Sequence, residues 1–298
     1  MFLSSIRQVL RATSRSRPRF PVLSKQSLSC TASRRAKPYN IIVLACSINL
    51  PILTLSTANA SNNPVGHKMA NLTEADKLFD ESKYEELESF LKKLENWQQD
   101  AQILWRVARC EFQLAKKVKD NKSEYEKLVN KAYEHVEKSL ELNEKDGFAH
   151  KWAAILLDAV STLKGTKERV LQVLNVRNHM EKAVEYAPKD PTSYYLLGEW
   201  HFSCYQVSWW ERKLANIAFG KLPDADMEVA LKMFEQAEEI EKDFYSKNKL
   251  MLAKTLFELK RDKERAIGLL EDIVAKYSSS DKWDDKEVSV RTCVRVTS

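Results

Sequence analysis

A trio of small or apolar residues with one fixed spacing recurs along the chain and limits what it can fold into. The members lie four and then three residues apart, as in Leu87, Leu91 and Leu94. The same spacing returns in Ala132–Val136–Ser139, Val176–Met180–Ala183, Ala230–Phe234–Ala237 and Ala266–Leu270–Ile273. Because residues three and four apart share one face of an α-helix, each segment is predicted to be a helix with one buried stripe. An all-α fold follows.

Most of these helices are followed by a second kind of helix that carries a small residue near its start. After Ala183, Pro188 ends one helix, and Gly198 removes a side chain where the next helix crosses its partner. Two-helix repeats of the tetratricopeptide (TPR) type have this arrangement. We therefore predict a right-handed superhelical array of TPR-like helical hairpins over residues 73–277. The predicted packing residues are Leu87, Leu91, Ala132, Val136, Ala183, Gly198, Ala230, Phe234 and Ala237.

The array is predicted to be irregular, because the trios do not return at the regular 34-residue interval of TPR repeats. Insertions at Ala115–Lys127 and Tyr205–Asp226 account for the difference, and the second is long enough to form its own short helix. The alternative is an irregular helical bundle in which the trios match by chance.

The N-terminal part has the composition of a targeting segment. Residues 1–73 contain ten Lys and Arg residues and no acid, the first carboxylate being Glu74. We expect residues 1–40 to be a disordered, basic, Arg/Ser-rich segment that resembles a mitochondrial transit peptide. The alternative is a basic tail with no targeting function. Residues 41–60 form a short hydrophobic segment, which we interpret as a weak membrane anchor or a sorting signal. A secretory signal is a further alternative. Residues 61–72 are expected to be a linker, and residues 278–298 an irregular tail.

The composition of the remaining chain favours a protein scaffold over an enzyme. The net charge of +6 comes from the basic N-terminal part, so the folded part is mildly acidic and no nucleic acid partner is expected. The five cysteines form no CxxC pair and are read as free thiols. Neither a Gly-rich phosphate loop nor an H-E-x-x-H or G-x-S-x-G motif is present. We expect no catalytic residue, metal site or cofactor, and His201 and Cys204 are read as a packing pair.

Stacked hairpins curve, and the first helix of each hairpin is expected to line the hollow side. The residues beside its packing positions are basic or hydrogen-bonding, which suits an extended acidic peptide. This predicted partner-binding groove consists of Arg106, Arg109, His150, Lys151, Tyr195, Lys247, Asn248 and Lys249. The alternative is that these are ordinary surface cations.

Several stretches together resemble the regulator of microtubule dynamics protein family, which is TPR-like. They are "ILWRVARC" (103–110), "HKWAAILL" (150–157), "AVEYAPKDPTSYYLLGEW" (183–200), "WWERKLANIAF" (209–219) and "DFYSKNKLMLAKTL" (243–256). The likeness covers roughly residues 73–277. It implies a non-enzymatic protein of the cytoplasm and cytoskeleton, at microtubules, the spindle and spindle poles, with some members at mitochondria. Tubulin, through its acidic disordered tails, is then the expected partner.

Two other functions stay open from the sequence. With a weak anchor and a Trp-rich insertion, the array could be a membrane-anchored mitochondrial scaffold or a lipid-binding contact-site protein. Its membrane-interface residues would be Trp209, Trp210, Arg212 and Lys213. The third function is an adaptor that docks chaperones by holding acidic C-termini.

Overall fold

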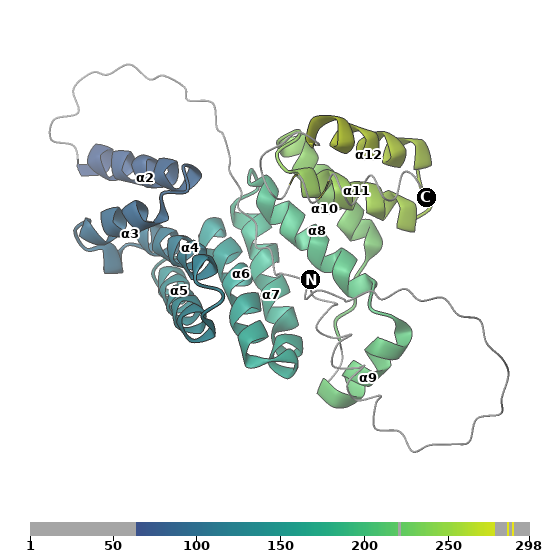
Figure 1. The fold of residues 1–298 in the computed structure, drawn as a ribbon, viewed down its shortest axis with the longest axis horizontal. Coiled ribbons are helices and arrows are strands. Elements are labelled where there is room, and N and C mark those ends of the chain that lie inside the picture. The colour runs from purple at the N-terminus through teal and green to yellow at the C-terminus, as the bar shows by residue number, and fades with distance from the viewer. Residues whose placement is uncertain (1–63, 220–221, 278–284, 286–287, 289–298) are drawn as a thin grey trace.

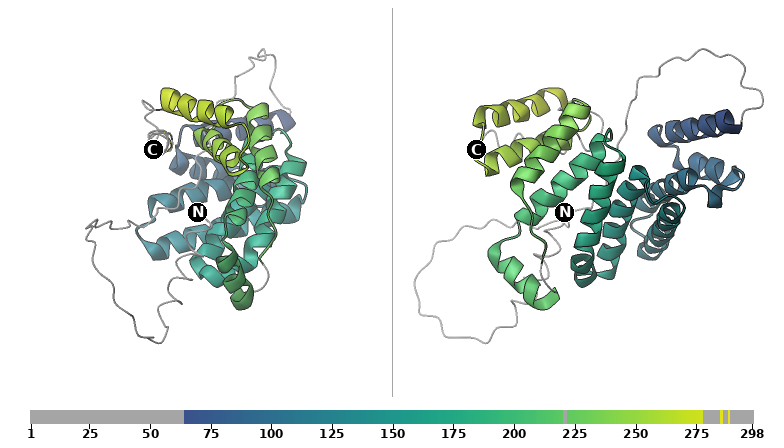
Figure 2. Two further views of the ribbon diagram at one scale, coloured as in Figure 1. Left: turned by 90° about the vertical axis from the view of Figure 1, so that its right-hand side faces the viewer. Right: turned by 180° about the vertical axis from the view of Figure 1, so that it is seen from behind.

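The structure, a computed structural model, describes residues 64–219, 222–277, 285 and 288, and all regular secondary structure in those residues is helical. The helices follow one another across the molecule in chain order, as Figure 1 shows, and Figure 2 shows the same order from two further sides. Five hairpins result: α2 (Pro64–Asp80) with α3 (Tyr84–Lys93), α4 (Ala101–Lys117) with α5 (Lys122–Leu142), α6 (Gly147–Lys164) with α7 (Thr166–Tyr186), α8 (Pro191–Tyr205) with α10 (Met227–Ile240), and α11 (Ser246–Glu258) with α12 (Lys263–Tyr277). A short 3-10 helix (Trp97–Gln99) precedes α4, and α9 (Trp209–Phe219) interrupts the fourth hairpin.

Aspartates fix where three of the first helices begin. The side chains of Asp100, Asp146 and Asp190 each accept a hydrogen bond from a backbone N–H in the first turn of α4, α6 and α8. Such N-caps satisfy donors that the helix itself leaves unpaired. Pro191 also occupies the first turn of α8, where its missing N–H costs nothing. The hairpin starts are therefore set by local sequence.

The predicted packing residues lie between the helices. All nine are buried, from Leu87 and Leu91 in α3 to Phe234 and Ala237 in α10. At Gly198 a Cβ atom would lie only 2.7 Å from the ring of Phe234, so α8 and α10 could not approach so closely with a side chain there. The predicted all-α array of helical hairpins is confirmed.

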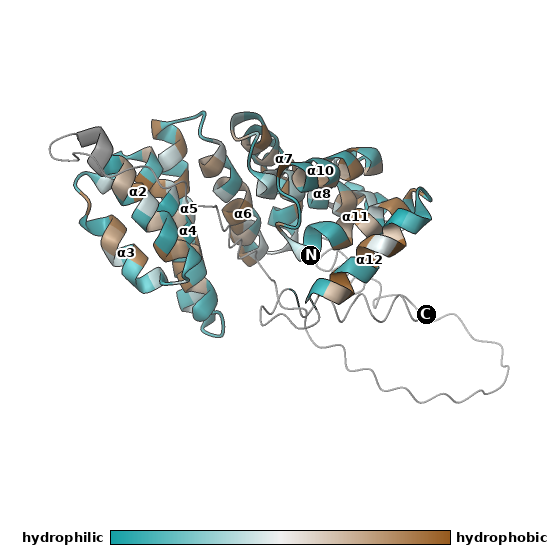
Figure 3. Cartoon of the chain, turned by 90° about the horizontal axis from the view of Figure 1, so that it is seen from above, coloured by the Kyte–Doolittle hydropathy of each residue, from teal (hydrophilic) through white to brown (hydrophobic). Residues whose placement is uncertain are grey.

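The apolar core consists of two clusters that meet at α6. Ala149, Trp152 and Leu156 pack with the helices before α6, whereas Ala154 and Leu157 pack with the helices after it. Figure 3 shows the hydrophobic colour along α6, in the middle of the array. Helix α6 is therefore apolar on two faces, as expected for a helix buried inside a stack.

The array bends toward the first helices of its hairpins. Helix α4 contacts both α2 and α6, and α8 contacts α11. Among the described residues, the second helices of successive hairpins make no contacts of similar extent. Elements on the inner side of a curved stack lie closer together, so we call the side formed by α2, α4, α6, α8 and α11 the A-helix face.

Two predicted boundaries need comment. Helix α2 begins at Pro64, so most of the predicted linker 61–72 is helical instead. The sequence pattern missed this because proline, which usually ends helices, is favoured in their first turn. The predicted segments 1–40 and 41–60 lie outside the described residues. Of the predicted tail 278–298 only Asp285 and Val288 are described, and Val288 is buried in the second core cluster.

The Tyr205–Asp226 insertion does carry a helix of its own, α9, as predicted. Figure 1 shows α9 at one side of the array, away from α11 and α12. None of the described helices combines the length and the apolar character that crossing a bilayer requires.

Candidate ligand-binding site on the A-helix face

A cluster of two arginines on the A-helix face lies between α2 and α4. Arg106 donates from Nε and Nη2 to the two carboxylate oxygens of Asp76, at 3.0 and 2.8 Å. Arg109 donates from Nη2 to the same carboxylate. The Arg106 guanidinium also lies 4.1 Å from the ring centroid of Trp105, and that of Arg109 lies 4.1 Å from Phe79. Two guanidinium groups therefore share one direct carboxylate partner, and both are held over aromatic rings.

Burial and charge act in opposite directions on this cluster. Burial alone would raise the pKa of Asp76, but hydrogen bonds and attraction from Arg106 and Arg109 outweigh it and lower that pKa. Burial lowers the pKa of Arg109 to about 10, although Asp76 opposes the change. The Arg109 guanidinium is thus charged at neutral pH. The Nε of Arg109 is buried and has no hydrogen-bond acceptor, so this cluster keeps one unsatisfied donor.

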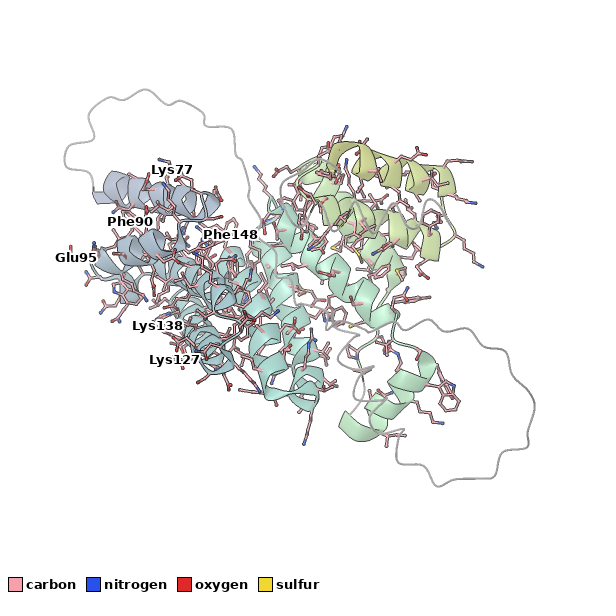
Figure 4. All side chains as sticks on the ribbon, viewed as in Figure 1. Lys77, Phe90, Glu95, Lys127, Lys138 and Phe148 are labelled. Carbon is pink, nitrogen blue, oxygen red and sulfur yellow. The ribbon has the colours of Figure 1, made fainter. Side chains whose placement is uncertain are left out.

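A stacked row continues from this cluster onto α6. The rings of Trp105 and Phe148 (labelled in Figure 4) lie 5.5 Å apart and are inclined by only 17°. The Lys151 ammonium sits 4.8 Å from the Phe148 ring centroid and 2.9 Å from a carboxylate oxygen of Asp190. The row therefore begins with the Arg106 guanidinium, continues through the rings of Trp105 and Phe148, and ends with the Lys151 ammonium. Since Asp190 caps α8, the Lys151 ion pair also joins the third hairpin to the fourth.

A second ion cluster lies at the C-terminal end of the array. Lys249 on α11 pairs with both Asp243 and Asp272. Lys276 on α12 pairs with the same two acids, at 2.9 and 3.1 Å. Burial would raise the pKa of each acid, but hydrogen bonds from Lys249 and Lys276 outweigh it and lower both. The two lysines and two aspartates balance in charge.

The remaining predicted groove residues take part mainly in contacts between helices. His150 places Nε2 2.8 Å from the carbonyl oxygen of Glu144 and Nδ1 2.8 Å from Nδ1 of His179. Burial lowers the pKa of both histidines, that of His179 to about 4. Asn248 donates to the Phe234 carbonyl oxygen at 3.1 Å and is fully buried.

Tyr195 is buried and packs edge-on against Tyr245, with ring centroids 5.2 Å apart. Lys247 is half-buried and lies 5.7 Å above the same Tyr245 ring.

The expectation of an open groove lined by all eight residues therefore needs correction. Arg106, His150, Lys151, Tyr195, Asn248 and Lys249 are buried, and Arg109 and Lys247 are half-buried. The physical reason is that buried cations must be paired. Arg106, Arg109 and Lys151 pair with acids from outside their own hairpins, whereas Lys249 pairs with Asp243 just before α11 and with Asp272 in its own hairpin. The structure brings Arg106, Arg109 and Lys151 together across α4 and α6, whereas Lys249 belongs to a separate cluster.

Sequence reasoning missed the acids that neutralise these cations, namely Asp76, Asp190, Asp243 and Asp272. It also missed Glu111, a fully buried carboxylate that contacts Lys92 and Lys131 at 3.0 Å and His135 at 2.7 Å. Burial would raise the pKa of Glu111, but its hydrogen bond with His135 and its lysine partners lower it. A carboxylate inside an otherwise apolar stripe, as in "ARCEFQLA", was the signal that could have revealed it.

The other candidate residues are placed as follows. Trp209, Trp210 and Lys213 lie exposed on α9, and Arg212 is half-buried beside them. His201 accepts a hydrogen bond from the Asp226 N–H at 3.3 Å, and Cys204 is buried and free. Within the part of the chain that the structure describes, no three His, Cys, Asp or Glu side chains are grouped to hold a metal ion.

Comparison with known proteins agrees with this architecture. The sequence model of the regulator of microtubule dynamics protein 1-3 family matches residues 71–294. The chain belongs to this family. Regulator of microtubule dynamics protein 1 of Mus musculus is 33% identical over 226 residues, which cover 76% of this chain and 73% of the relative. The family match extends beyond residue 277, where the resemblance noticed in the sequence ended.

A more distant member of the family and one solved structure give two further comparisons. Regulator of microtubule dynamics protein 2 of Bos taurus is 29% identical over 69% of this chain and 50% of its own length. The crystal structure of a thermophilic TPR protein from Thermus thermophilus superposes with a TM-score of 0.50 at 14% identity, covering 78% of this chain and all of that one. The family member described here therefore has a TPR-like fold.

Proposed function

We propose that this chain is a non-enzymatic scaffold that regulates microtubule and spindle dynamics by binding acidic tubulin tails on its A-helix face. Membership of the regulator of microtubule dynamics protein family supports the cellular role. The TPR-like fold supports a scaffold, because stacked hairpins offer an extended surface to a peptide. We further propose that the protein acts in the cytoplasm, at microtubules and spindle poles. The mitochondrial address of residues 1–40 stays a prediction.

The observation that carries this proposal is the pair Arg106 and Arg109 sharing Asp76. Arginine binds carboxylates in a two-pronged geometry, and here a single carboxylate serves two guanidinium groups. The unsatisfied Nε of Arg109 shows that the internal acid does not use all the donors of the pair. The Asp76 side chain is 41% exposed, so a glutamate-rich tail would meet the guanidinium pair from the Asp76 side.

Asp76 acts in this mechanism as an internal competitor of the tail. A tail carboxylate would replace or join Asp76 on the guanidinium pair, and the row toward Lys151 would extend the contact to α6. Internal competition keeps the affinity for a single carboxylate low. Tails with several acids in a row are then favoured, because a second contact forms at high local concentration.

The test is the isosteric substitution Asp76→Asn, which removes the competing charge and leaves both arginines in place. Co-pelleting of the full chain with microtubules should show binding at least about tenfold tighter, about 1.4 kcal/mol. The gain should disappear when the tubulin tails are cleaved and should shrink as salt is added. Adding Arg106→Met and Arg109→Met to Asp76→Asn should abolish it.

A matched control is Glu85→Gln, which removes a carboxylate from the exposed Lys117–Glu85 pair. It changes the net charge by the same amount at a site away from Arg106. If Glu85→Gln tightens binding as much as Asp76→Asn, only the overall charge matters. Equal binding of Asp76→Asn and wild type would refute the site.

A further inference from the structure

Three large apolar side chains of helix α9 are exposed. Trp209, Trp210 and Ile217 are 62%, 66% and 76% exposed. Together with Lys213 they share one face, because positions 209, 213 and 217 are four apart and 210 precedes 213 by three. Ala215, on the opposite side, is buried. An ordinary amphipathic helix would place the tryptophans inward and the alanine outward.

Helix α9 is held in place by hydrogen bonds from residues that lie beside its exposed face. Arg212 donates from Nη1 to the Pro223 carbonyl oxygen at 3.0 Å and from Nη2 to the Cys204 carbonyl oxygen at 2.9 Å. Asn216 accepts from the Leu222 N–H at 2.7 Å. Figure 4 shows α9 at one side of the array. The tryptophans are thus presented outward by a fixed support.

The exposed face also combines aromatic rings with a cation. The rings of Trp209 and Trp210 are 4.4 Å apart and inclined by 72°. The Lys213 ammonium lies 5.1 Å from one ring centroid and 5.9 Å from the other. Tryptophan with a neighbouring lysine is typical of the membrane–water interface, where rings lie among headgroups and the ammonium reaches lipid phosphates.

The area of the exposed apolar patch on α9 favours a lipid bilayer over a protein as its partner. A large aromatic side chain offers about 150–250 Å² of surface, so the three apolar residues together expose roughly 400 Å². That is far below the about 800 Å² per partner that a stable protein–protein interface buries. A bilayer needs no matching shape, and three inserted side chains suffice for reversible binding.

We propose that α9 docks on a lipid bilayer, with Trp209, Trp210 and Ile217 entering the interfacial region and Lys213 contacting lipid phosphates. This inference does not depend on the A-helix face, because it concerns another surface and another ligand. It adds a membrane contact to the proposed function in microtubule regulation.

The test uses the full chain with vesicles of phosphatidylcholine, with and without phosphatidylserine. Flotation should show binding of wild type, and Trp209→Ser, Trp210→Ser and Ile217→Ser together should weaken it by at least about tenfold. Lys213→Glu should weaken binding chiefly to vesicles that contain phosphatidylserine. The matched control is Met69→Ser with Leu142→Ser, which alters exposed apolar residues on α2 and α5.

A second measurement places the tryptophans at the bilayer directly. Lipids brominated in the acyl chains should quench wild-type tryptophan fluorescence, and Trp209→Phe with Trp210→Phe should remove most of this quenching while vesicle binding persists. All variants keep residues 41–60, so any binding by that segment is common to them. Equal flotation of the triple serine variant and the control, or wild-type fluorescence that brominated lipids leave unchanged, would overturn the proposal.

Discussion

Replacing Gly198 by alanine tests how closely α8 and α10 are packed. An alanine Cβ would lie 2.7 and 2.9 Å from two carbon atoms of the Phe234 ring, whereas carbon atoms in contact are normally about 3.5–4.0 Å apart. The ring would have to move by about 1 Å. Phe234 is fully buried, and its ring centroid lies 6.1 Å from that of Tyr195, so it has little room to do so.

Two opposing contributions set the expected change in stability. Overpacking of a core costs about 1–3 kcal/mol. Alanine inside a helix is favoured over glycine by about 0.8–1 kcal/mol. We therefore expect Gly198→Ala to lower the free energy of unfolding by about 1 kcal/mol, within a range of about 0–2 kcal/mol. For a domain of this size each kcal/mol lowers Tm by about 2–4 °C.

Gly268 provides a matched control, because it lies in α12 with no neighbouring atom within 4 Å of the point where an alanine Cβ would lie. Gly268→Ala should raise the unfolding free energy by about 0.8–1 kcal/mol, since only the helix preference changes. Thermal and urea unfolding of the full chain, followed by far-UV circular dichroism, measures both variants. The two substitutions are chemically identical and should act in opposite directions.

A double-mutant cycle assigns the cost of Gly198→Ala to Phe234. Phe234→Leu alone should be destabilising, but in the Gly198→Ala background its cost should shrink, because the smaller side chain makes room for the new methyl group. Higher stability of Gly198→Ala than of wild type, or strict additivity in the cycle, would refute the close approach of the two helices.

Two further predictions concern buried titratable groups. Burial, together with the nearby charges of His150 and Lys182, lowers the pKa of His179 from its ordinary 6.5 to about 4. Between these two pH values the unfolded chain therefore binds a proton at His179 that the folded chain does not bind. Stability should fall as the pH drops from about 6.5 to about 4, by up to about 1.4 kcal/mol per pH unit, and urea titrations of His179→Asn should show a flatter profile over that range. Burial raises the pKa of the Cys110 and Cys204 thiols to about 12, so iodoacetamide at mildly alkaline pH should leave both unmodified in the native protein and label both in urea, as peptide mass spectrometry would show. Rapid labelling of either thiol in the folded chain would contradict its burial.

Much of the fold could be predicted because the repeat is encoded by local spacing. The trio around Leu87 and Leu91 and the glycine at position 198 report contacts within one hairpin, where the period of the helix fixes which side chains meet. Trp105, Trp152 and Trp200 lie within apolar stretches of the sequence and are buried. These features need no knowledge of the neighbouring hairpins.

The candidate site was harder to predict because its charges pair between hairpins. Asp76 lies thirty residues before Arg106, and Asp190 comes from the joint after the hairpin that holds Lys151. Such pairings depend on the register of successive hairpins, which irregular insertions change. The sequence therefore indicated where the cations lie along the first helices, but not that acids outside their own hairpins already pair with Arg106, Arg109 and Lys151.

The two buried faces of α6 decide how this array can come apart. If the hairpins before α6 open, the surface around Trp152 meets water, and if those after it open, the surface around Leu157 does so. Either event exposes one of the two apolar faces of α6 to water. Opening the array at α6 therefore costs free energy whichever side separates. The outermost hairpins have no neighbour beyond them among the described helices, and we expect unravelling to begin at those ends and to reach α6 last.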